Sequence, residues 1–423
     1  MLGLSRNTVL SAYDLLSAEQ LATSRGRSGT HIAENARSAR RGSPRSALRA
    51  PSRYASRVRT LLPLTLGPMR EQPRYDLHYG EPIADPRLFH SWRRKLAAAA
   101  LRAGPRYPEP SGFRPLRRAI AEHLGRHRGI VCTENEVLIV GGTQQAVTLT
   151  ARVVSVRADE SGLVTAELAK HRAGLICVTP SHQFPSGSVL SLERRFELLR
   201  IANSQGSWIL EDDYDSEFQY RGRPLGALRS MDLSDRVIYV GTFSKTLFPS
   251  LRLGYIVCPT SLRDDLCAAK RLDDLGSPAI EQAALASFMR SGQFDKYLRK
   301  SVAELRQRRS VLLEGLRRHG GDRVEIHDGQ AGVHVVVWFR RLNYPQLDRL
   351  IEIGIKQGLG LYPMHPNYET RPAQPGLLLG YAGLSAASLE AATKLFGKCL
   401  DMLDQETGIG DYRRARARRK SSP

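Results

Sequence analysis

The chain has 423 residues, 41% of them hydrophobic, so it can bury a sizeable core and form more than one domain. No apolar run reaches bilayer length and no secretory signal opens the chain, so we expect a cytoplasmic protein rather than a membrane or secreted one. The net charge of +21 favours a polyanionic partner, although an arginine-rich proteome would produce the same bias.

The first segment, "MLGLSRNTVLSAYDLL", predicts an amphipathic helix that begins after a Ser5 cap. The apolar residues of this helix fall on one face: Val9, Ala12, Tyr13 and Leu16. Its outward side chains can bond phosphates or base edges: Arg6, Asn7, Thr8 and Ser11. A turn-rich hairpin completes residues 1–33, a pattern typical of a DNA-reading helix followed by a basic turn.

Two basic segments flank the rest of the chain. Residues 34–75 are rich in Arg, Ser, Pro and Ala without sustained periodicity, which predicts a flexible linker. A second basic run, "RRARARRK", falls in a tail that we expect over residues 409–423. Charge gathered in such arms is typical of nonspecific nucleic-acid binding.

Between these segments, apolar strands alternate with amphipathic helices. The predicted strands "VLIVGG", "GLICVTP", "SWILEDD" and "VIYVGTF" each end in polar residues or glycine. The alternation predicts an α/β fold with a mostly parallel sheet and ligands at the carboxyl ends of the strands. Long helices after Leu251 and a short α+β segment predict a large domain over residues 76–300 and a small C-terminal domain over 301–408.

Groups that can bind a ligand follow these strands. Gly141, Gly142, Thr143 and Gln144 lie between a strand and a helix, where backbone amides can hold a phosphate. His182 follows the second strand, and a lone histidine of this kind is more often structural. The five cysteines are scattered without metal-ligand spacing, so we expect no catalytic thiol and no metal site.

The other two strand ends carry an acidic cluster and a lysine. Glu211, Asp212, Asp213 and Tyr214 follow one strand, and Lys245 follows the next within an apolar run. Desolvation there would lower the pKa of Lys245 and favour an imine with an aldehyde. A phosphate-binding turn, an Asp, a Tyr and an enclosed Lys together meet the needs of pyridoxal phosphate: a Schiff base, a pyridinium partner and a phenolate partner.

Five motifs in order resemble the MocR subgroup of the GntR family: "SGFRPLRRAI", "GGTQQA", "TPSHQFPSG", "EDDYDSEF" and "FSKTLFPSLRLGY". The resemblance implies that residues 76 to about 408 form a fold-type I, PLP-dependent transferase-like domain. The head, residues 2–33, is similar to the recognition helix and wing of GntR regulators, that is, to a partial winged helix-turn-helix. The family further implies a homodimer that binds operator DNA and controls transcription.

The resemblance also implies roles for individual residues. Lys245 matches the lysine that holds the cofactor, and Tyr214 matches the phenolate partner. Asp212 matches the partner of the pyridine nitrogen, with Asp213 left open, and His182 stays a second-rank cofactor contact. Phosphate-binding positions of the family match Gly142, Thr143, Gln144, Thr242 and Arg252. Tyr107 resembles a tyrosine that reaches across the dimer to the neighbouring phosphate, with a packed loop aromatic as an equal alternative.

In the head, the resemblance assigns DNA contacts to one set of residues: Ser5, Arg6, Asn7, Thr8, Arg25, Arg27, Ser28, Gly29 and Thr30. A winged helix-turn-helix needs two further helices to cover the apolar face of the recognition helix. The sequence shows neither, so we expect an N-terminal truncation. A short helix without packing partners is marginal in water, and operator binding should therefore be weak.

Two other departures from the family concern the cofactor site. The segment after "GGTQQAVTLTARV" runs almost directly into the next strand, which predicts the loss of roughly one βα unit and of the residue that stacks on the cofactor ring. In "GLLLGYAGL", Leu378 and Leu379 stand where transaminases of this fold place an arginine for the substrate carboxylate. Arg371 is nearby but lies in a Pro-rich loop.

These features leave three functions open. The first is a transcriptional regulator that uses pyridoxal phosphate, or an imine formed from it, as effector. The second is a PLP-dependent aminotransferase acting on an amino acid, in which Lys245 moves the proton. The third is a nonfunctional remnant. The head and the basic linker favour the regulator, because a transaminase has no need of a wing, so we expect a protein that is not a true enzyme.

Overall fold

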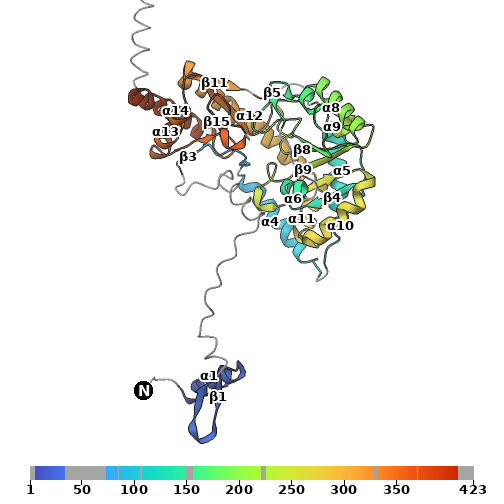
Figure 1. Ribbon diagram of the computed structural model, residues 1–423, viewed down its shortest axis with the longest axis vertical. Coiled ribbons are helices and arrows are strands. Elements are labelled where there is room, and N and C mark those ends of the chain that lie inside the picture. The colour runs from blue at the N-terminus through green and yellow to red at the C-terminus, as the bar shows by residue number, and fades with distance from the viewer. Residues whose placement is uncertain are drawn as a thin grey trace, which may run out of the picture. The chain divides into compact units, whose positions relative to one another are not determined.

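The computed structural model describes residues 5–33, 73–83, 85–104, 107–148, 156–220, 225–327, 329, 331–368 and 370–407 (Figure 1). The chain divides into two compact units, Met1–Gly67 and Pro68–Pro423. The expected tail, and the expected linker apart from residues 73–75, lie outside the described residues. Among the described helices, none is long and apolar enough to span a membrane.

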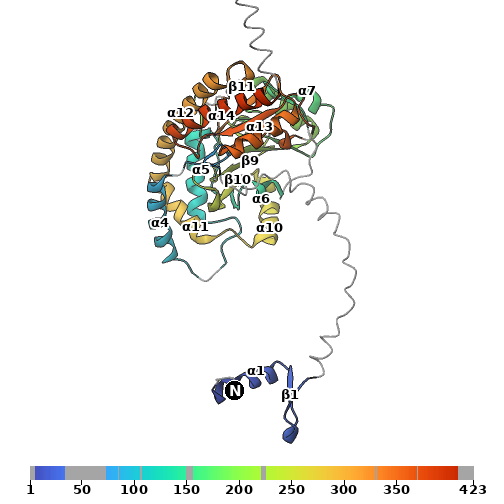
Figure 2. The same ribbon diagram turned by 90° about the vertical axis from the view of Figure 1, so that its left-hand side faces the viewer.

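The described part of the first unit, residues 5–33, contains a helix and a two-stranded hairpin (Figure 2). Helix α1 (Arg6–Ala18) leads into strands β1 (Ala22–Ser24) and β2 (Thr30–Ile32), which pair antiparallel. The hydroxyl of Ser5 caps α1 by accepting a hydrogen bond from the Thr8 amide at 3.2 Å. The predicted helix, its cap and the hairpin are confirmed.

Two features of this unit bear on DNA binding. Gly26 and Gly29 have φ values of +53° and +87° where the hairpin reverses, a conformation that favours glycine. The apolar face of α1 is open to solvent, because Val9, Tyr13 and Leu16 are 36%, 49% and 40% exposed. The helix therefore presents an apolar face as well as a polar one, and most helices depend on packing of the apolar face for stability.

The second unit is built on a five-stranded sheet in the order β4, β10, β9, β8, β7. Its strands are β4 (Val137–Val140), β7 (Leu175–Val178), β8 (Trp208–Asp213), β9 (Val237–Thr242) and β10 (Gly254–Val257). Four strands run in the same direction, and β10 lies antiparallel between β4 and β9. The mostly parallel sheet is confirmed, and β10 is a strand that the sequence pattern did not identify.

Helices cover both faces of this sheet because its side chains alternate (Figure 1). Ile139 of β4 belongs to one core cluster together with Leu116 of α5, whereas its neighbours Leu138 and Val140 join another with Ala146 of α6. The helices of this part are α4 (Pro86–Ala100), α5 (Arg114–Arg128), α6 (Thr143–Thr148), α7 (Thr165–Leu168), α8 (Leu192–Gln205), α9 (Leu228–Met231), α10 (Arg263–Asp274) and α11 (Ala279–Arg290).

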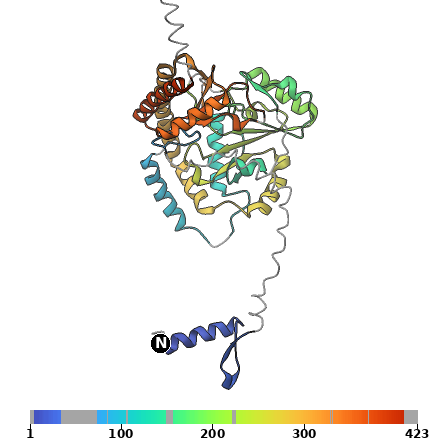
Figure 3. The ribbon, with the colours of Figure 1, turned by 60° about the vertical axis from the view of Figure 1, so that its left-hand side comes forward.

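The C-terminal elements, in orange and red, gather on one side of the second unit (Figure 3). They form an antiparallel sheet in the order β11, β12, β15, β14 with three long helices. Their bounds are β11 (Val324–His327), β12 (His334–Phe339), β14 (Tyr362–Pro363), β15 (Gly376–Gly380), α12 (Gln293–Gly320), α13 (Tyr344–Lys356) and α14 (Ala386–Thr407).

Two connections join this small domain to the large one. The boundary expected at residues 300–301 falls inside α12, which is one unbroken helix and so belongs to both domains. Strand β3 (Tyr75–Asp76) pairs in parallel with β13 (Leu359–Gly360), so the segment expected to open the large domain is attached to the small one. These attachments bring residues 77–83 back toward the large sheet.

The sheet ends at β7 in the part of the chain that the structure describes. After α6, residues 149–155 lie outside the described residues, and a short hairpin follows, β5 (Ala158–Asp159) with β6 (Gly162–Leu163). One edge of β7 pairs with β8. The predicted loss of a βα unit concerns the other edge, and it stays a prediction.

Candidate cofactor site

The central strands bring the predicted site residues to one edge of the sheet. Val140, at the end of β4, and Thr242, at the end of β9, both lie beside Gly254 of β10. Asp212 of β8 lies beside Val240 of β9. The turns that follow these strands therefore open at the same edge, where α/β proteins bind their ligands.

The turn after β4 lies under the guanidinium group of Arg252. Gly142 is buried with φ +108°, and a Cβ atom there would lie 3.6–3.8 Å from that guanidinium group. Thr143 and Gln144 form the first turn of α6 directly after it. A cation above glycine backbone, next to the start of a helix, is an arrangement suited to a phosphate. Gly142 and Arg252 therefore lie together, with Thr143 and Gln144 next in the chain, and the phosphate-binding role of these four residues stays a prediction.

The turn after β9 adds two hydroxyl groups. The buried hydroxyl of Thr242 donates to Ser244 Oγ at 3.1 Å and accepts from the Ser244 amide at 3.2 Å. This turn leads directly to Lys245. Thr242 is thereby held at the end of β9, beside Gly254 of β10 and three residues before Lys245.

The acidic residues at the end of β8 make different contacts. Glu211 accepts hydrogen bonds from two backbone amides at the start of α9, at 2.7 and 2.8 Å. Asp213 forms a buried ion pair with Arg128 at 2.7 Å and accepts a hydrogen bond from the Tyr239 hydroxyl at 2.5 Å. Glu211, and Asp213 through its Oδ2 atom, are thus occupied in holding the fold. The Oδ1 atoms of Asp212 and Asp213 are both buried without a hydrogen-bond partner, but Asp213 already has the charge of Arg128 beside it, which leaves Asp212 for a ligand.

Asp212 has the properties expected of a carboxylate that binds a positively charged group of a ligand. Its Oδ1 atom is buried without a hydrogen-bond partner. Burial and the neighbouring charges of Asp213 and Asp215 raise the pKa of Asp212 to about 7, against the opposing effect of Lys245. A buried carboxylate without a partner costs free energy, which a protonated ring nitrogen would recover. The contacts therefore favour Asp212 over Asp213 as the ring partner.

Lys245 is half-buried at the end of this edge. Its Nζ donates a hydrogen bond to the carbonyl oxygen of Gly80 at 2.8 Å. Burial lowers the pKa of Lys245, against the charges of Asp215, Glu81 and Asp212, which raise it. A lower pKa increases the share of neutral amine, the form that attacks an aldehyde.

Gly80 has no room for a side chain. Its φ is +84°, and a Cβ atom there would overlap Lys245 Nζ. We expect Gly80→Ala to lower the free energy of unfolding by about 1–3 kcal/mol through backbone strain, and to displace the amine. Chemical denaturation and titration with cofactor measure both effects. Gly104→Ala is the matched control, because nothing lies within 4 Å of a Cβ atom at that exposed position, and an equal response of the two variants would contradict the expectation.

His182 contacts the other functional side chain of this edge, Tyr214. His182 is buried, and its Nδ1 lies 2.8 Å from Asp215 Oδ2 and 3.1 Å from the Tyr214 hydroxyl. An N–H at Nδ1 shared between the two oxygens leaves the Tyr214 proton available for a ligand. Burial and Asp215 raise the pKa of Tyr214 well above its ordinary value, so the hydroxyl stays a donor. His182 is thus placed as a positioning residue rather than as a direct ligand.

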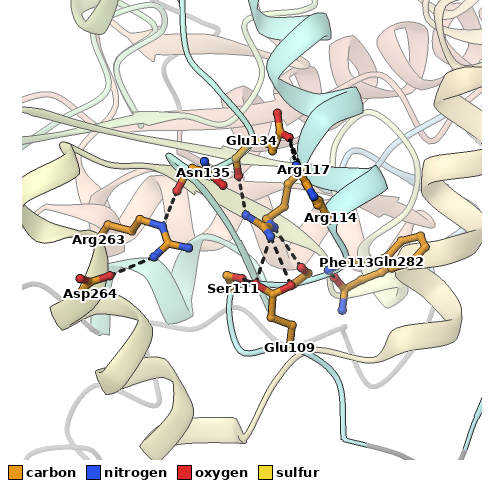
Figure 4. Close-up of polar contacts among 11 residues, drawn as sticks. Glu109, Ser111, Phe113, Arg114, Arg117, Glu134, Asn135, Arg263, Asp264 and Gln282 are labelled. Carbon is orange, nitrogen blue, oxygen red and sulfur yellow. Dashed lines mark hydrogen bonds and ion pairs between the residues drawn. The ribbon is translucent and has the colours of Figure 1, made fainter.

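A network of polar contacts holds the segment from Glu109 to Phe113, which follows Tyr107 in the chain (Figure 4). Arg117 of α5 donates to Glu109 at 3.1 Å and to the Glu134 carbonyl oxygen at 2.6 Å. The amide of Phe113 donates to the Gln282 side chain of α11 at 2.7 Å. The ring of Tyr107 itself is 83% exposed. The alternative of a packed loop aromatic is therefore wrong for the single chain.

Strand β15, "GLLLG", has no charged side chain. Leu378 is fully buried and clusters with Val336 and Met364. The guanidinium group of Arg371 lies over the Tyr344 ring, 4.5 Å from its centroid. The position expected to bind a substrate carboxylate is thus apolar, and the nearby arginine is stacked on an aromatic ring.

Comparisons with known proteins agree with this geometry. The family Aminotransferase class I and II matches residues 162–392. The probable rhizopine catabolism regulatory protein MocR of Rhizobium meliloti is 34% identical over 92% of this chain and 85% of its own length. The pyridoxine biosynthesis regulator PdxR of Corynebacterium glutamicum, an HTH-type transcriptional regulator, is 29% identical over 90% and 84%. The chain belongs to the MocR subfamily of GntR-type transcriptional regulators.

Solved structures confirm the fold of the second unit. Pyrococcus horikoshii kynurenine aminotransferase, solved in complex with PMP, superposes with a TM-score of 0.70 at 21% identity, covering 87% of this chain and 98% of that one. The multiple substrate aminotransferase of Thermococcus profundus gives 0.71 at 23% identity, over 87% and 99%. The MocR-subfamily chain therefore has the fold-type I architecture that its motifs implied.

Pyridoxal phosphate is the cofactor of this domain family, and the described residues fit it. The cofactor supplies an aldehyde that joins reversibly to amines and a ring that withdraws electrons. The fit rests on the unpartnered Asp212 Oδ1 and on the side-chain-free position of Gly142 under Arg252. Lys245 would provide the amine, Asp212 the charge for the ring nitrogen, and Tyr214 a donated proton.

Three residues of the site escaped sequence reasoning. Gly80 lies at the start of the predicted large domain, Asp215 inside the "EDDYDSEF" motif, and His334 in the predicted small domain, and none of the three was predicted as a site residue. The His334 ring packs on His182 with centroids 4.8 Å apart. The polar residue in "GVHVVVWF" was the available signal, since a buried strand gives a histidine no solvent to bond.

Proposed function

We propose that this MocR-subfamily protein is a DNA-binding regulator of transcription that acts in the cytoplasm and senses pyridoxal phosphate, or an amine joined to it, at Lys245. The observation that carries the proposal is that one chain contains both a helix and hairpin suited to DNA and a site suited to pyridoxal phosphate. The first unit holds a capped helix and a glycine-turn hairpin, and the second holds a half-buried lysine beside an unpartnered carboxylate. Effector binding would shift the populations of two arrangements of a dimer.

The DNA-binding part of the proposal rests on exposed polar side chains. Arg6 and Thr8 on α1, and Arg25, Ser28 and Thr30 at the hairpin, are exposed. Ser5 serves as the helix cap, and its Oγ lies 2.9 Å from Thr8 Oγ1. The side chains of Asn7 and Arg27 lie outside the described residues. Arginines on a helix and a wing can bind phosphates, and the helix can present side chains to base edges.

The alternative of an amino-acid transaminase lacks support at β15. Such an enzyme needs a cation for the substrate carboxylate, whereas Leu378 lies in an apolar cluster and Arg371 is stacked on Tyr344. Lys245 and Asp212 would serve a sensor equally well, because a sensor needs reversible attachment of the ligand without turnover. Robust transamination with several amino donors would favour the enzyme.

We also propose a homodimer in which Tyr107 reaches the phosphate of the partner subunit. Tyr107 is exposed, and the chain that follows it is held by the bonds of Arg117 to Glu109 and of Gln282 to Phe113. A large, exposed aromatic side chain next to a held segment is suited to an interface. Analytical ultracentrifugation of the full chain measures the oligomeric state.

The test of the DNA-binding proposal is selection from a random duplex pool followed by a gel shift. We expect only weak enrichment of a sequence, because the apolar face of α1 has no helix packed against it among the described residues of the first unit. The binding of that sequence should change on addition of pyridoxal phosphate, and no such change should occur in Lys245→Ala. Arg6→Ala should weaken binding and, if Arg6 contacts a phosphate, lower the salt dependence by about one counterion. Arg102→Ala, exposed in the other unit, is the control. A pool without enrichment would refute sequence-specific binding by this chain.

A further inference from the structure

Two histidines and an aspartate converge on the side of the second unit where α5 meets the start of α12. His123 and His127 are four residues apart on α5, so their rings lie on one face, with centroids 4.5 Å apart. Asp295 lies in the first turn of α12. Its Oδ1 lies 3.7 Å from His123 Nδ1 and 3.8 Å from His127 Nε2.

These separations are too long for hydrogen bonds and close to those within a metal centre. A hydrogen bond to nitrogen spans about 2.7–3.2 Å. Ligands bound tetrahedrally to Zn²⁺ at about 2.0–2.1 Å stand roughly 3.4 Å from one another. The three ligand atoms here all lie within 4.8 Å of one another, so small side-chain rotations would close the site. Two imidazoles and one carboxylate are a ligand set that Zn²⁺ favours.

His123 provides a second, independent observation. Its side chain is 5% exposed, and its Nδ1 atom is shielded from solvent without a hydrogen-bond partner. A buried polar atom of this kind normally has a partner, because leaving it without one costs free energy. Nδ1 is the atom nearest Asp295, so the unpartnered group points toward the other two ligands.

The neighbouring arginine does not compete for the same oxygen. Arg126 Nη2 lies 3.5 Å from Asp295 Oδ2, whereas both histidines face Oδ1. A metal ion bound through Oδ1 would leave Oδ2 with Arg126, which would orient the carboxylate as outer contacts do in other metal sites. His127 and Asp295 are partly exposed, so an ion can enter from solvent and keep a water in its remaining position.

A second cluster of the described residues does not qualify. His182, Asp215 and His334 also offer three ligand atoms close together. However, His182 Nδ1 is already bonded to Asp215 at 2.8 Å, and this group supports Tyr214 in the cofactor site.

We propose that His123, His127 and Asp295 form a site for a divalent transition metal of the Zn²⁺ class. The site does not depend on the proposed regulatory function. It would tie α5, which packs on the large sheet, to the beginning of α12, the helix shared with the small domain. The expectation of no metal site considered cysteine spacing and overlooked the pair of histidines in "HLGRH".

The test uses the full chain without a histidine tag, treated with chelator and titrated with Zn²⁺ by calorimetry and with Co²⁺ by visible absorbance. We expect one ion per chain and a Co²⁺ spectrum of low-symmetry coordination. His127→Ala and Asp295→Asn should each weaken binding at least about tenfold, since loss of outer contacts alone costs that much. His123 is too buried to serve as the first variant, because its replacement can disturb the fold.

The matched control is His90→Ala, which removes an exposed histidine from another helix, α4. We expect this variant to bind Zn²⁺ and Co²⁺ as the unaltered chain does. Zn²⁺ should also raise the unfolding temperature of the unaltered chain and of His90→Ala, but not that of His127→Ala. The absence of saturable binding, or binding that both His127→Ala and Asp295→Asn retain, would overturn the proposal.

Discussion

Replacing Lys245 with alanine is expected to abolish covalent attachment of pyridoxal phosphate. The reason is local: Lys245 Nζ is held at the sheet edge by its hydrogen bond to Gly80, and burial lowers its pKa, so a share of the amine is neutral and reactive. The measurement is the visible absorbance after cofactor addition, followed by borohydride reduction and mass spectrometry of the peptide that contains residue 245. Noncovalent binding should persist, because the phosphate-binding turn is unchanged.

The control for this variant is Lys394→Ala, which removes an exposed lysine on α14 and should leave attachment unchanged. Covalent cofactor on Lys245→Ala would contradict the assignment. Mixing Lys245→Ala with Tyr107→Ala chains also tests the dimer. Each mixed dimer would contain one site with both native residues and one with neither, so the attachment per Lys245 should exceed that of the Tyr107→Ala dimer at the same cofactor concentration. An unchanged level after subunit exchange would count against Tyr107 acting across the dimer.

The ends of the strands could be predicted from sequence because each is a local pattern. An apolar run followed by glycine or polar residues identified β4, β7, β8 and β9, and the parallel pairing of β7, β8 and β9 fixed which ends meet. Lys245 and the acidic cluster followed from that placement, whereas the choice of Asp212 came from the family resemblance and left Asp213 open. Strand β10 was not predicted because "GYIV" overlaps the end of the "FSKTLFPSLRLGY" motif, from which only Lys245 and Arg252 were assigned.

Contacts between segments that are distant in the chain could not be predicted from the sequence. Gly80 reaches Lys245 across 165 residues, through the pairing of β3 with β13, and neither two-residue strand has a sequence signature. The partner of Asp213 is Arg128, which stands at the end of α5 where a basic residue is ordinary. Only the fold shows that this arginine is buried and committed to one of two adjacent acids.

The second prediction compares the adjacent carboxylates Asp213 and Asp212, which we expect to serve stability and cofactor binding respectively. Asp213→Asn should lower the free energy of unfolding by about 3 kcal/mol, because it leaves the buried Arg128 without its counter-charge. Asp212→Asn should cost little stability, since an amide is cheaper to bury than an unpartnered carboxylate. The cofactor should respond in the opposite order: Asp212→Asn should weaken binding about tenfold or more, as expected for loss of a charge-assisted hydrogen bond.

Chemical denaturation measures the free energy of unfolding of the two variants, and titration measures their affinity for the cofactor. If Asp212→Asn and Asp213→Asn changed both quantities equally, the two acids would not have the separate roles proposed here. The pH dependence of stability, compared between Asp212→Asn and the unaltered chain, gives a further test. The folded pKa of Asp212, about 7, lies above the ordinary value of about 3.9 for an unfolded Asp, so the folded chain holds the extra proton between these limits. The contribution of Asp212 to stability therefore falls as pH rises from about 4 to 7. Asp212→Asn removes this loss, so its stability relative to the unaltered chain should increase across the same window, most clearly when no cofactor is bound.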